Sequence, residues 1–134
     1  MKVKMIDLGG ITPTRAHYND AGLDCFANES KSIAPGDRAR IRLGFGLELP
    51  DGYVALLLPR SSLNANGVRV EVGTIDSGYR GEVQAVVVND TKEFIVINQD
   101  MKVAQLVVMP IAYVELVDEL GEDRATGGFG SSGK

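Results

Sequence analysis

The sequence holds very little of the chemistry on which many metal sites and nucleophilic enzymes depend: its 134 residues include one cysteine, one histidine and no tryptophan. With Cys25 alone, the chain can form neither an internal disulfide nor a cage of several thiolates around a metal. With His17 alone, it cannot build a site from several imidazoles, and a Ser-His-Asp triad would need a histidine that no nucleophile motif accompanies. If the protein is an enzyme, a carboxylate must carry the proton chemistry.

The charge and the apolar runs exclude further classes. A formal net charge of −4 argues against a general nucleic-acid binder, which normally carries a basic face. A few clustered arginines could still bind a small anionic substrate. No apolar run approaches the length of a membrane-spanning helix, and the N-terminal stretch MKVKMIDLGG lacks the apolar core of a signal peptide. We therefore expect a cytoplasmic protein with neither a nucleic-acid nor a membrane partner.

What the chain does contain is a series of short apolar segments between Gly, Pro, Asn and Asp turns. Several segments are rich in β-branched residues, which is typical of strands buried between two sheets. The only helical turn that we predict lies near Ser62–Ala65. The pattern predicts one all-β domain, a sandwich, jelly roll or barrel. The predicted strands are Val3–Asp7, Leu23–Phe26, Arg38–Leu43, Phe45–Leu49, Tyr53–Leu58, Val68–Val72, Val83–Asn89, Phe94–Ile97, Val103–Met109 and Tyr113–Val117.

The segment from Gly121 to Lys134 differs in composition from the rest. It reads GEDRATGGFGSSGK, with one aromatic residue and no apolar run of strand length. Such a segment cannot bury enough surface to offset its chain entropy, so we expect it to be mobile when free. It could become ordered on a ligand or partner, or be an idle tail, which composition alone favours. We therefore divide the chain into a β domain of residues 1–120 and a flexible arm of residues 121–134.

The stretch Pro59-Arg60-Ser61-Ser62 follows an apolar predicted strand. An arginine and two hydroxyls at a strand end, opening a turn with free backbone amides, suit an anion such as phosphate. The alternative is a solvated turn capped by serines. In the C-terminal arm, glycines would let backbone amides approach phosphates, Arg124 would add charge, and Phe129 offers a flat face for a base.

The stretch from Gly73 to Glu82 combines two glycines with a Tyr-Arg pair and an acid. It resembles a tight hairpin that holds an acid and an aromatic ring in one pocket. Asp76 could act as a general base on water, while the ring of Tyr79 packs on a sugar or base. An Asp-Ser-Gly turn with a packed tyrosine is the alternative.

Two single polar residues also qualify as candidates. Asp24 could bind a metal or its water shell, because Mg²⁺ keeps several waters when it accompanies phosphates. A turn residue is the simpler interpretation of an acid so close to a glycine. Gln105 interrupts an apolar strand, and since a buried amide needs partners, it is either a core hydrogen-bonding residue or a ligand contact.

Taken in order, these stretches resemble the five motifs of the trimeric dUTPase family, whose members split dUTP into dUMP and pyrophosphate. The resemblance covers nearly the whole chain with the spacing of that family. It implies a jelly-roll-like β subunit, a homotrimer with three active sites at the subunit interfaces, and a C-terminal arm that closes over a site formed by the other chains. The matching segments are Ala21–Ala27, Pro59–Gly67, Gly73–Glu82, Val103–Leu106 and Arg124–Gly133.

The resemblance also implies roles for individual residues. Asp76 matches the carboxylate that activates the water attacking the α-phosphorus, and Tyr79 matches the ring that leaves no room for a 2′-hydroxyl. Asp24 matches the acid that orients waters on the phosphate-bound Mg²⁺. Uracil would be read by backbone at Gly73, Thr74 and Ile75, with the Phe129 ring above it. The remaining substrate contacts would be Arg60, Ser61, Ser62, Gln105, Arg124, Gly130, Ser131 and Ser132.

Such an enzyme would limit uracil incorporation into DNA and supply dUMP for dTMP synthesis. The sequence departs from the family pattern at Gly78, where many relatives carry a second acid, and at Lys102, where arginine is common. Val68–Val72 lacks the Gly or Asn often seen before the hairpin, which leaves a side-chain contact to uracil open. Two alternatives share the scaffold: a dCTP deaminase, and a nucleotide-sensing protein without catalysis.

Overall fold

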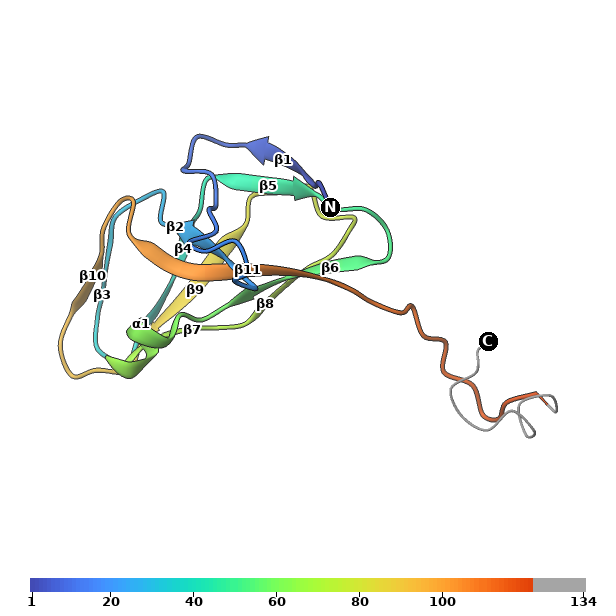
Figure 1. Ribbon diagram of the computed structural model, residues 1–134. Helices are drawn as coiled ribbons and strands as arrows, with labels where there is room; N and C mark the ends of the chain where they lie inside the picture. The colour runs from blue at the N-terminus through green and yellow to red at the C-terminus, as the bar shows by residue number, and fades with distance from the viewer. Residues whose placement is uncertain (122–134) are drawn as a thin grey trace.

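The computed structural model describes residues 1–121, and within them it has eleven strands and one short helix (Figure 1). The predicted all-β class is confirmed. The elements are β1 (Lys4–Asp7), β2 (Leu23–Phe26), β3 (Lys31–Ile33), β4 (Arg38–Arg42), β5 (Phe45–Glu48), β6 (Tyr53–Leu58), α1 (Ser61–Ala65), β7 (Val68–Val70), β8 (Gly73–Ile75), β9 (Gln84–Asn89), β10 (Ile95–Ile97) and β11 (Lys102–Pro110).

The strands form a four-stranded sheet, β2-β11-β6-β8, a three-stranded sheet, β4-β9-β7, and two ribbons, β1-β5 and β10-β3. All pairs are antiparallel. Side chains that are at most 1% exposed come from both larger sheets, Leu57 and Val103 from one, Ile41 and Val87 from the other. The core therefore lies between two sheets, as in a jelly roll. Among residues 1–121, no helix has the length and apolar character needed to span a membrane.

The turn between β4 and β5 fastens the N-terminal segment to the sheets. The carbonyl oxygen of Gly44 accepts hydrogen bonds from the amides of Leu8 and Gly10, both at 3.0 Å. Gly44 has φ of 75°, and a Cβ built on it would lie 2.4 Å from Cα of Gly10. A side chain at this position is thus opposed by both the backbone conformation and the contact.

Nine of the ten predicted strands are confirmed, most with ends shifted by one or two residues, and so is the helical turn, which is α1. The sequence did not indicate β3 or β8 as strands. Each has three residues and only one buried apolar side chain, Ile33 or Ile75. Such segments become strands because their backbone groups pair with a neighbouring strand. No local sequence pattern predicts this pairing.

The predicted strand Tyr113–Val117 is wrong for the single chain. This segment pairs with no strand of residues 1–121, and its apolar side chains are exposed, Leu116 by 93% and Val114 by 78%. Its start is held to the body, because the amide of Gly52 donates to the Tyr113 hydroxyl at 2.8 Å. The segment then leaves the sheets, as Figure 1 shows at the end of β11. A strand needs a pairing partner, which the same chain does not provide here.

The predicted hairpin over Gly73–Glu82 also needs correction. A tight turn is present, closed by a 3.1 Å hydrogen bond from the Tyr79 amide to the Asp76 carbonyl. The flanking strands do not pair with each other, however, since β8 pairs with β6, and β9 pairs with β4 and β7. The stretch is a corner that carries the chain from one sheet to the other.

Candidate active site

The four-stranded sheet brings four of the five sequence motifs together. In its register, Asp24 of β2 lies opposite Gln105 of β11, which lies opposite Leu58 of β6. On the other side of β6, Leu57 lies opposite Gly73 of β8. Segments that are far apart in sequence are therefore neighbours across one sheet, and the candidate residues fall into two groups, one at each side of β6.

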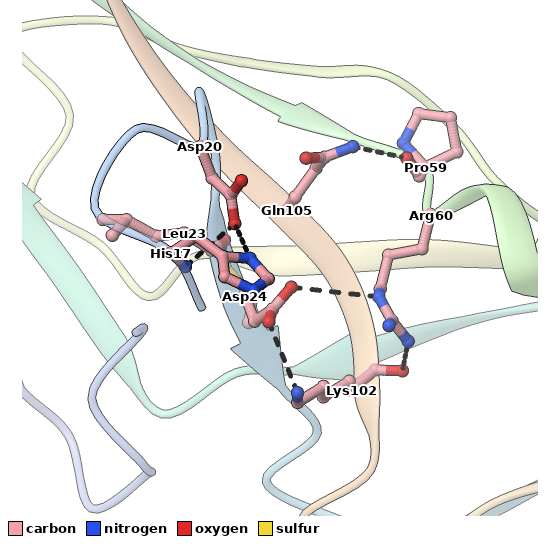
Figure 2. Close-up of polar contacts among 9 residues, drawn as sticks. His17, Asp20, Leu23, Asp24, Pro59, Arg60, Lys102 and Gln105 are labelled. Atoms are coloured by element: carbon pink, nitrogen blue, oxygen red, sulfur yellow. Dashed lines mark hydrogen bonds and ion pairs between the residues drawn. The ribbon is translucent and has the colours of Figure 1, made fainter. Parts of the chain in front are cut away.

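The first group is a charged cluster around Asp24 (Figure 2). The Asp24 carboxylate lies 3.9 Å from Nε of Arg60 and 3.4 Å from Nζ of Lys102. Arg60 also donates to the Lys102 carbonyl oxygen at 3.3 Å. The side chains of Asp24 and Arg60 are 20% and 29% exposed. Two cations face a single carboxylate, so the cluster keeps an excess positive charge that suits an anion.

Gln105 and the start of α1 adjoin this cluster. Nε2 of Gln105 donates to the Pro59 carbonyl oxygen at 3.1 Å, so the side chain has the hydrogen-bond partner that its position requires. A Cβ on Gly22 would lie 2.5 Å from Oε1 of Gln105, which confines the amide. Ser61 and Ser62 open α1 with exposed side chains. The first amides of a helix have no intrahelical acceptor, so hydroxyls and amides are both available beside Arg60.

The second group surrounds a hollow of about 470 Å³ between β8, the 76–83 corner and the outer face of β4 and β9. The predicted acid and aromatic ring, Asp76 and Tyr79, both line it, so the expectation that they share a pocket is confirmed. The backbone candidates line it too. The lining residues are Arg40, Leu57, Gly73, Thr74, Ile75, Asp76, Tyr79, Glu82, Val83 and Gln84.

The Tyr79 ring is held in place from two sides. Its hydroxyl donates to the carbonyl oxygen of Glu82 at 2.9 Å. Its hydroxyl end packs on Gly81, because a Cβ there would lie 2.5 Å from the hydroxyl oxygen and 2.6 Å from Cζ. The ring therefore forms a fixed wall of the hollow, close to Asp76.

The two acids of the hollow, Glu82 and Asp76, differ in whether the protein already binds their carboxylates. Oε2 of Glu82 accepts a 2.8 Å hydrogen bond from the Gly44 amide, so this carboxylate is committed to the backbone. The exposed Asp76 side chain makes no ion pair or hydrogen bond with residues 1–121. Of the two carboxylates, Asp76 is the one with both oxygens free of contacts with residues 1–121 and open to a bound water.

The motifs did not single out Arg40, Glu82 or Gln84 as pocket residues. Glu82 stands inside a motif, so its place there could have been inferred. Arg40 and Gln84 come from paired strands, β4 and β9, and only the register of those strands shows that they line the hollow.

A single chain does not unite the two groups. None of Asp24, Arg60 and Gln105 lines the hollow around Asp76. Three strand spacings of about 4.8 Å separate β2 from β8, which is roughly 14 Å. The five arm candidates lie outside the described residues: Arg124, Phe129, Gly130, Ser131 and Ser132.

The donor set around Asp24 fits a metal ion that arrives with its ligand. Within residues 1–121 no group of three or more His, Cys, Asp and Glu side chains could hold a metal ion. One carboxylate beside two cations is no cage for a resident ion. It does fit a Mg²⁺ held mainly by phosphate oxygens and waters, with Asp24 contacting one of those waters.

Two further features are separate from this chemistry. Burial, with the neighbouring Asp24 charge, raises the pKa of the Cys25 thiol to about 12, so the thiol is neutral and has no nucleophilic role at neutral pH.

A second hollow of about 350 Å³ lies under the N-terminal strand β1, between β5 and the β2-β11 pair. Its lining is mostly apolar, with Val3, Met5 and Val108 among its residues, and it contains none of the predicted site residues.

Comparison with known proteins shows the family to which the chain belongs. The family model described as dUTPase matches residues 10–133. The deoxyuridine 5'-triphosphate nucleotidohydrolase of Clostridium acetobutylicum is 45% identical, and the match covers 99% of this chain and 96% of that protein. The corresponding protein of Clostridium tetani is 43% identical, over 100% and 97% of the two chains.

Solved structures of phage enzymes have the same fold. A dUTPase from phage phi11 of S. aureus superposes with a TM-score of 0.83 at 29% identity, over 91% of this chain and 99% of that one. A mutant of the phi11 enzyme, described for its coordination of a structural Mg(II) ion, gives 0.84 at 28% identity, over 90% and 99%. A mutant dUTPase of Staphylococcus bacteriophage 80alpha with dUpNHpp gives 0.81 at 27% identity, over 90% and 92%. The family resemblance inferred from the motifs is confirmed: the chain belongs to the dUTPase family.

Proposed function

We propose that this protein hydrolyses dUTP to dUMP and pyrophosphate. The observation that carries the proposal is the hollow in which the free carboxylate of Asp76 and the fixed ring of Tyr79 face the backbone of β8. The curated relatives named for the hydrolysis of deoxyuridine 5'-triphosphate support it. In a cell, the reaction would limit uracil incorporation into DNA and supply dUMP for dTMP synthesis, in a cytoplasmic setting.

In the proposed reaction, Asp76 takes a proton from a water as that water attacks the α-phosphorus. A new bond forms between the water oxygen and phosphorus, the bond to the bridging oxygen breaks, and pyrophosphate leaves. Backbone groups of Gly73, Thr74 and Ile75 would read the uracil edge, and the ring of Tyr79 would lie against the deoxyribose. A sugar with a 2′-hydroxyl would have no space there.

The phosphate chain would be held by the cluster that contains Arg60, Ser61, Ser62 and Gln105. Asp24 would contact a water of a Mg²⁺ ion that travels with the triphosphate, and Mg²⁺ when bound would neutralise part of the phosphate charge. Arm residues would complete the enclosure, Arg124 at the γ-phosphate and Phe129 over uracil, with Gly130, Ser131 and Ser132 as further contacts.

We also propose that the working form is a homotrimer with shared sites. Two observations support assembly. The hollow around Asp76 contains none of Asp24, Arg60 and Gln105, and β2, which carries Asp24, lies three strand spacings or roughly 14 Å from β8, so a single triphosphate would be served better by groups from two chains. In addition, the segment 111–117 exposes large apolar side chains, including Val114 and Leu116, whose burial against another chain would be favourable.

The decisive experiment is a comparison of pyrophosphate release from dUTP, dTTP, dCTP and UTP in the presence of Mg²⁺. We expect rapid release from dUTP and slow release from the other three. Ammonia release from dCTP would indicate a deaminase instead. Binding of dUTP without any pyrophosphate release would indicate a nucleotide sensor.

A further inference from the structure

Arg40 belongs to the hollow around Asp76, although no sequence motif includes it. It is the central residue of β4, whose exposed Arg38, Arg40 and Arg42 alternate with inward-facing Ala39 and Ile41. In the register with β9, Arg42 lies opposite Gln84 and Arg40 lies opposite Val86. Because side chains two residues apart share a sheet face, Arg40 and Gln84 project on the same side. Both line the hollow.

Arg40 differs from the other arginines of this sheet in its ion pairs. Arg38 pairs with Glu71, Arg42 with Glu29, and Arg69 with Asp90. The guanidinium of Arg40 has no such partner within the described part of the chain. Its backbone carbonyl oxygen accepts a 2.8 Å hydrogen bond from Nζ of Lys31, which fixes the strand and leaves the guanidinium available to a ligand.

The register places Arg40 toward one end of the hollow. The amide of Glu71 donates to the Val86 carbonyl oxygen at 2.9 Å, so the chain entering β8 passes β9 at the residue opposite Arg40. Gly73 follows two residues later, whereas Asp76 lies at the far end of β8, where the chain turns. Arg40 is thus on the Gly73 side of the hollow. The proposed function puts the nucleobase on that side and the α-phosphorus near Asp76.

We infer that Arg40 donates a hydrogen bond to a carbonyl oxygen of the nucleobase and selects uracil over cytosine. The inference rests on the proposed function. A guanidinium has five N–H donors and no acceptor. It can pair with the 4-carbonyl of uracil, but it meets only another donor at the 4-amino group of cytosine. Arg40 is therefore a specificity-determining residue of the same site.

The test compares Arg40→Leu with Arg42→Leu, a change of the same type two residues along the same exposed strand face, outside the hollow. Steady-state pyrophosphate release from dUTP and dCTP gives the specificity ratio. We expect Arg40→Leu to lower kcat/KM for dUTP about tenfold or more, mainly through KM, and to change dCTP little. Arg40→Lys should recover part of the ratio, and Arg42→Leu should keep it. Both sites are exposed, so thermal unfolding should change little.

Competitive inhibition by deoxyuridine, which has no phosphate, identifies the part of the ligand that Arg40 contacts. We expect Arg40→Leu to weaken this inhibition by a factor similar to its effect on KM. Equal losses of kcat/KM for dUTP and dCTP, with deoxyuridine inhibition unchanged, would show that Arg40 contacts the phosphates. That result would overturn the inference. So would an unchanged specificity ratio. Wild-type protein that releases no pyrophosphate from dUTP would overturn the proposed function as well, so the two failures can be told apart.

Discussion

At the scale of single residues, the acids around the candidate site differ in what already binds them. Asp24 faces Arg60 and Lys102, and Glu82 accepts a hydrogen bond from a backbone amide. Asp76 makes neither contact within residues 1–121, although it shares a hollow with Tyr79. A general base must be reached by the water that it deprotonates, and Asp76 has both carboxylate oxygens free for that water.

Asp76→Asn should therefore separate binding from turnover. The amide has the size of the carboxylate but cannot take a proton from water, so we expect kcat to fall about 10²–10⁴-fold while the Kd for dUTP stays similar. Pyrophosphate release and titration calorimetry measure the two quantities. The matched control is Asp37→Asn, in the turn before β4, where the oxygen that accepts from the Arg38 amide is retained. Near-normal turnover of Asp76→Asn would remove Asp76 from the role of base.

Gly81 tests the position of the Tyr79 ring. Alanine there would put a methyl group 2.5 Å from the Tyr79 hydroxyl oxygen, so the ring must move. Misplacement of a positioning group by about 1 Å can cost up to 10²-fold, and we expect kcat/KM for dUTP to fall about tenfold or more, with weaker discrimination against UTP. Gly78→Ala, in the same corner with open space around the new methyl, should behave like wild type. Equal kinetics in both variants would contradict the packing argument.

Cys25 predicts a dependence of stability on alkaline pH. Its pKa is raised from 9.0 to about 12 by burial and by Asp24, so the folded state favours the neutral thiol. The resulting stability is fully present below pH 9 and is lost as the pH rises toward 12, because the unfolded chain ionises first. Between pH 8 and about pH 10.5, the free energy of unfolding of the wild type should fall by about 2 kcal/mol more than that of Cys25→Ala. Denaturant unfolding of both proteins at the two pH values measures this, and parallel losses would contradict it.

At the scale of elements, β11 organises the site. It is the longest strand, with nine residues, and it pairs with both β2 and β6. Its register is irregular between Lys102 and Ala104, where the pairing with β2 shifts by one residue. A bulge changes the direction of nearby side chains. This irregularity therefore affects the directions in which Lys102 and Gln105 point toward Asp24 and Pro59.

The turn between β4 and β5 offers a prediction at the same scale. Gly36 and Gly44 have φ of 76° and 75°, but only Gly44 would bring a methyl group against the backbone of Gly10. Gly36→Ala should lose about 1 kcal/mol of unfolding free energy from the backbone conformation alone. Gly44→Ala should lose about 2 kcal/mol more, because the N-terminal segment must be displaced. Denaturant unfolding measures both, and equal losses would show that the contact contributes nothing.

At the scale of the whole molecule, the chain leaves part of its apolar surface uncovered. The segment 111–117 lies extended after β11, with Val114 and Leu116 largely exposed and without a pairing strand from its own chain. Its wrong prediction as a strand of the single chain is informative. An alternating apolar pattern shows that a segment is suited to pairing, but the partner can come from another subunit.

Ending the chain at Gly121 should preserve the fold and reduce the activity. Residues 1–121 contain every strand and the whole core described here, so we expect the truncated protein to fold and assemble like the full chain. Pyrophosphate release from dUTP should fall at least tenfold, because the proposed contacts of Arg124 and Phe129 are lost. Circular dichroism, light scattering for the mass of the assembly, and steady-state kinetics measure these outcomes. Full activity after truncation would exclude a catalytic role for the arm.

The sequence by itself determined the β class, nine strands, and the residue types that the chemistry needs. These properties are local: alternation of apolar side chains specifies a strand, and Gly, Pro and Asp specify where it ends. The motifs around Asp76 and Arg60 could also be identified from the sequence, because each combines its reactive groups within a few residues.

Only the tertiary structure decided which strands pair, and with them the shape of the site. β8 joined β6 and not β9, so the expected hairpin became a corner between two sheets. Arg40 entered the hollow beside Asp76 through the register of β4 with β9. Strand pairing is a contact between distant segments, and its free energy depends on burial across the whole molecule. No window of sequence around Asp76 contains that information.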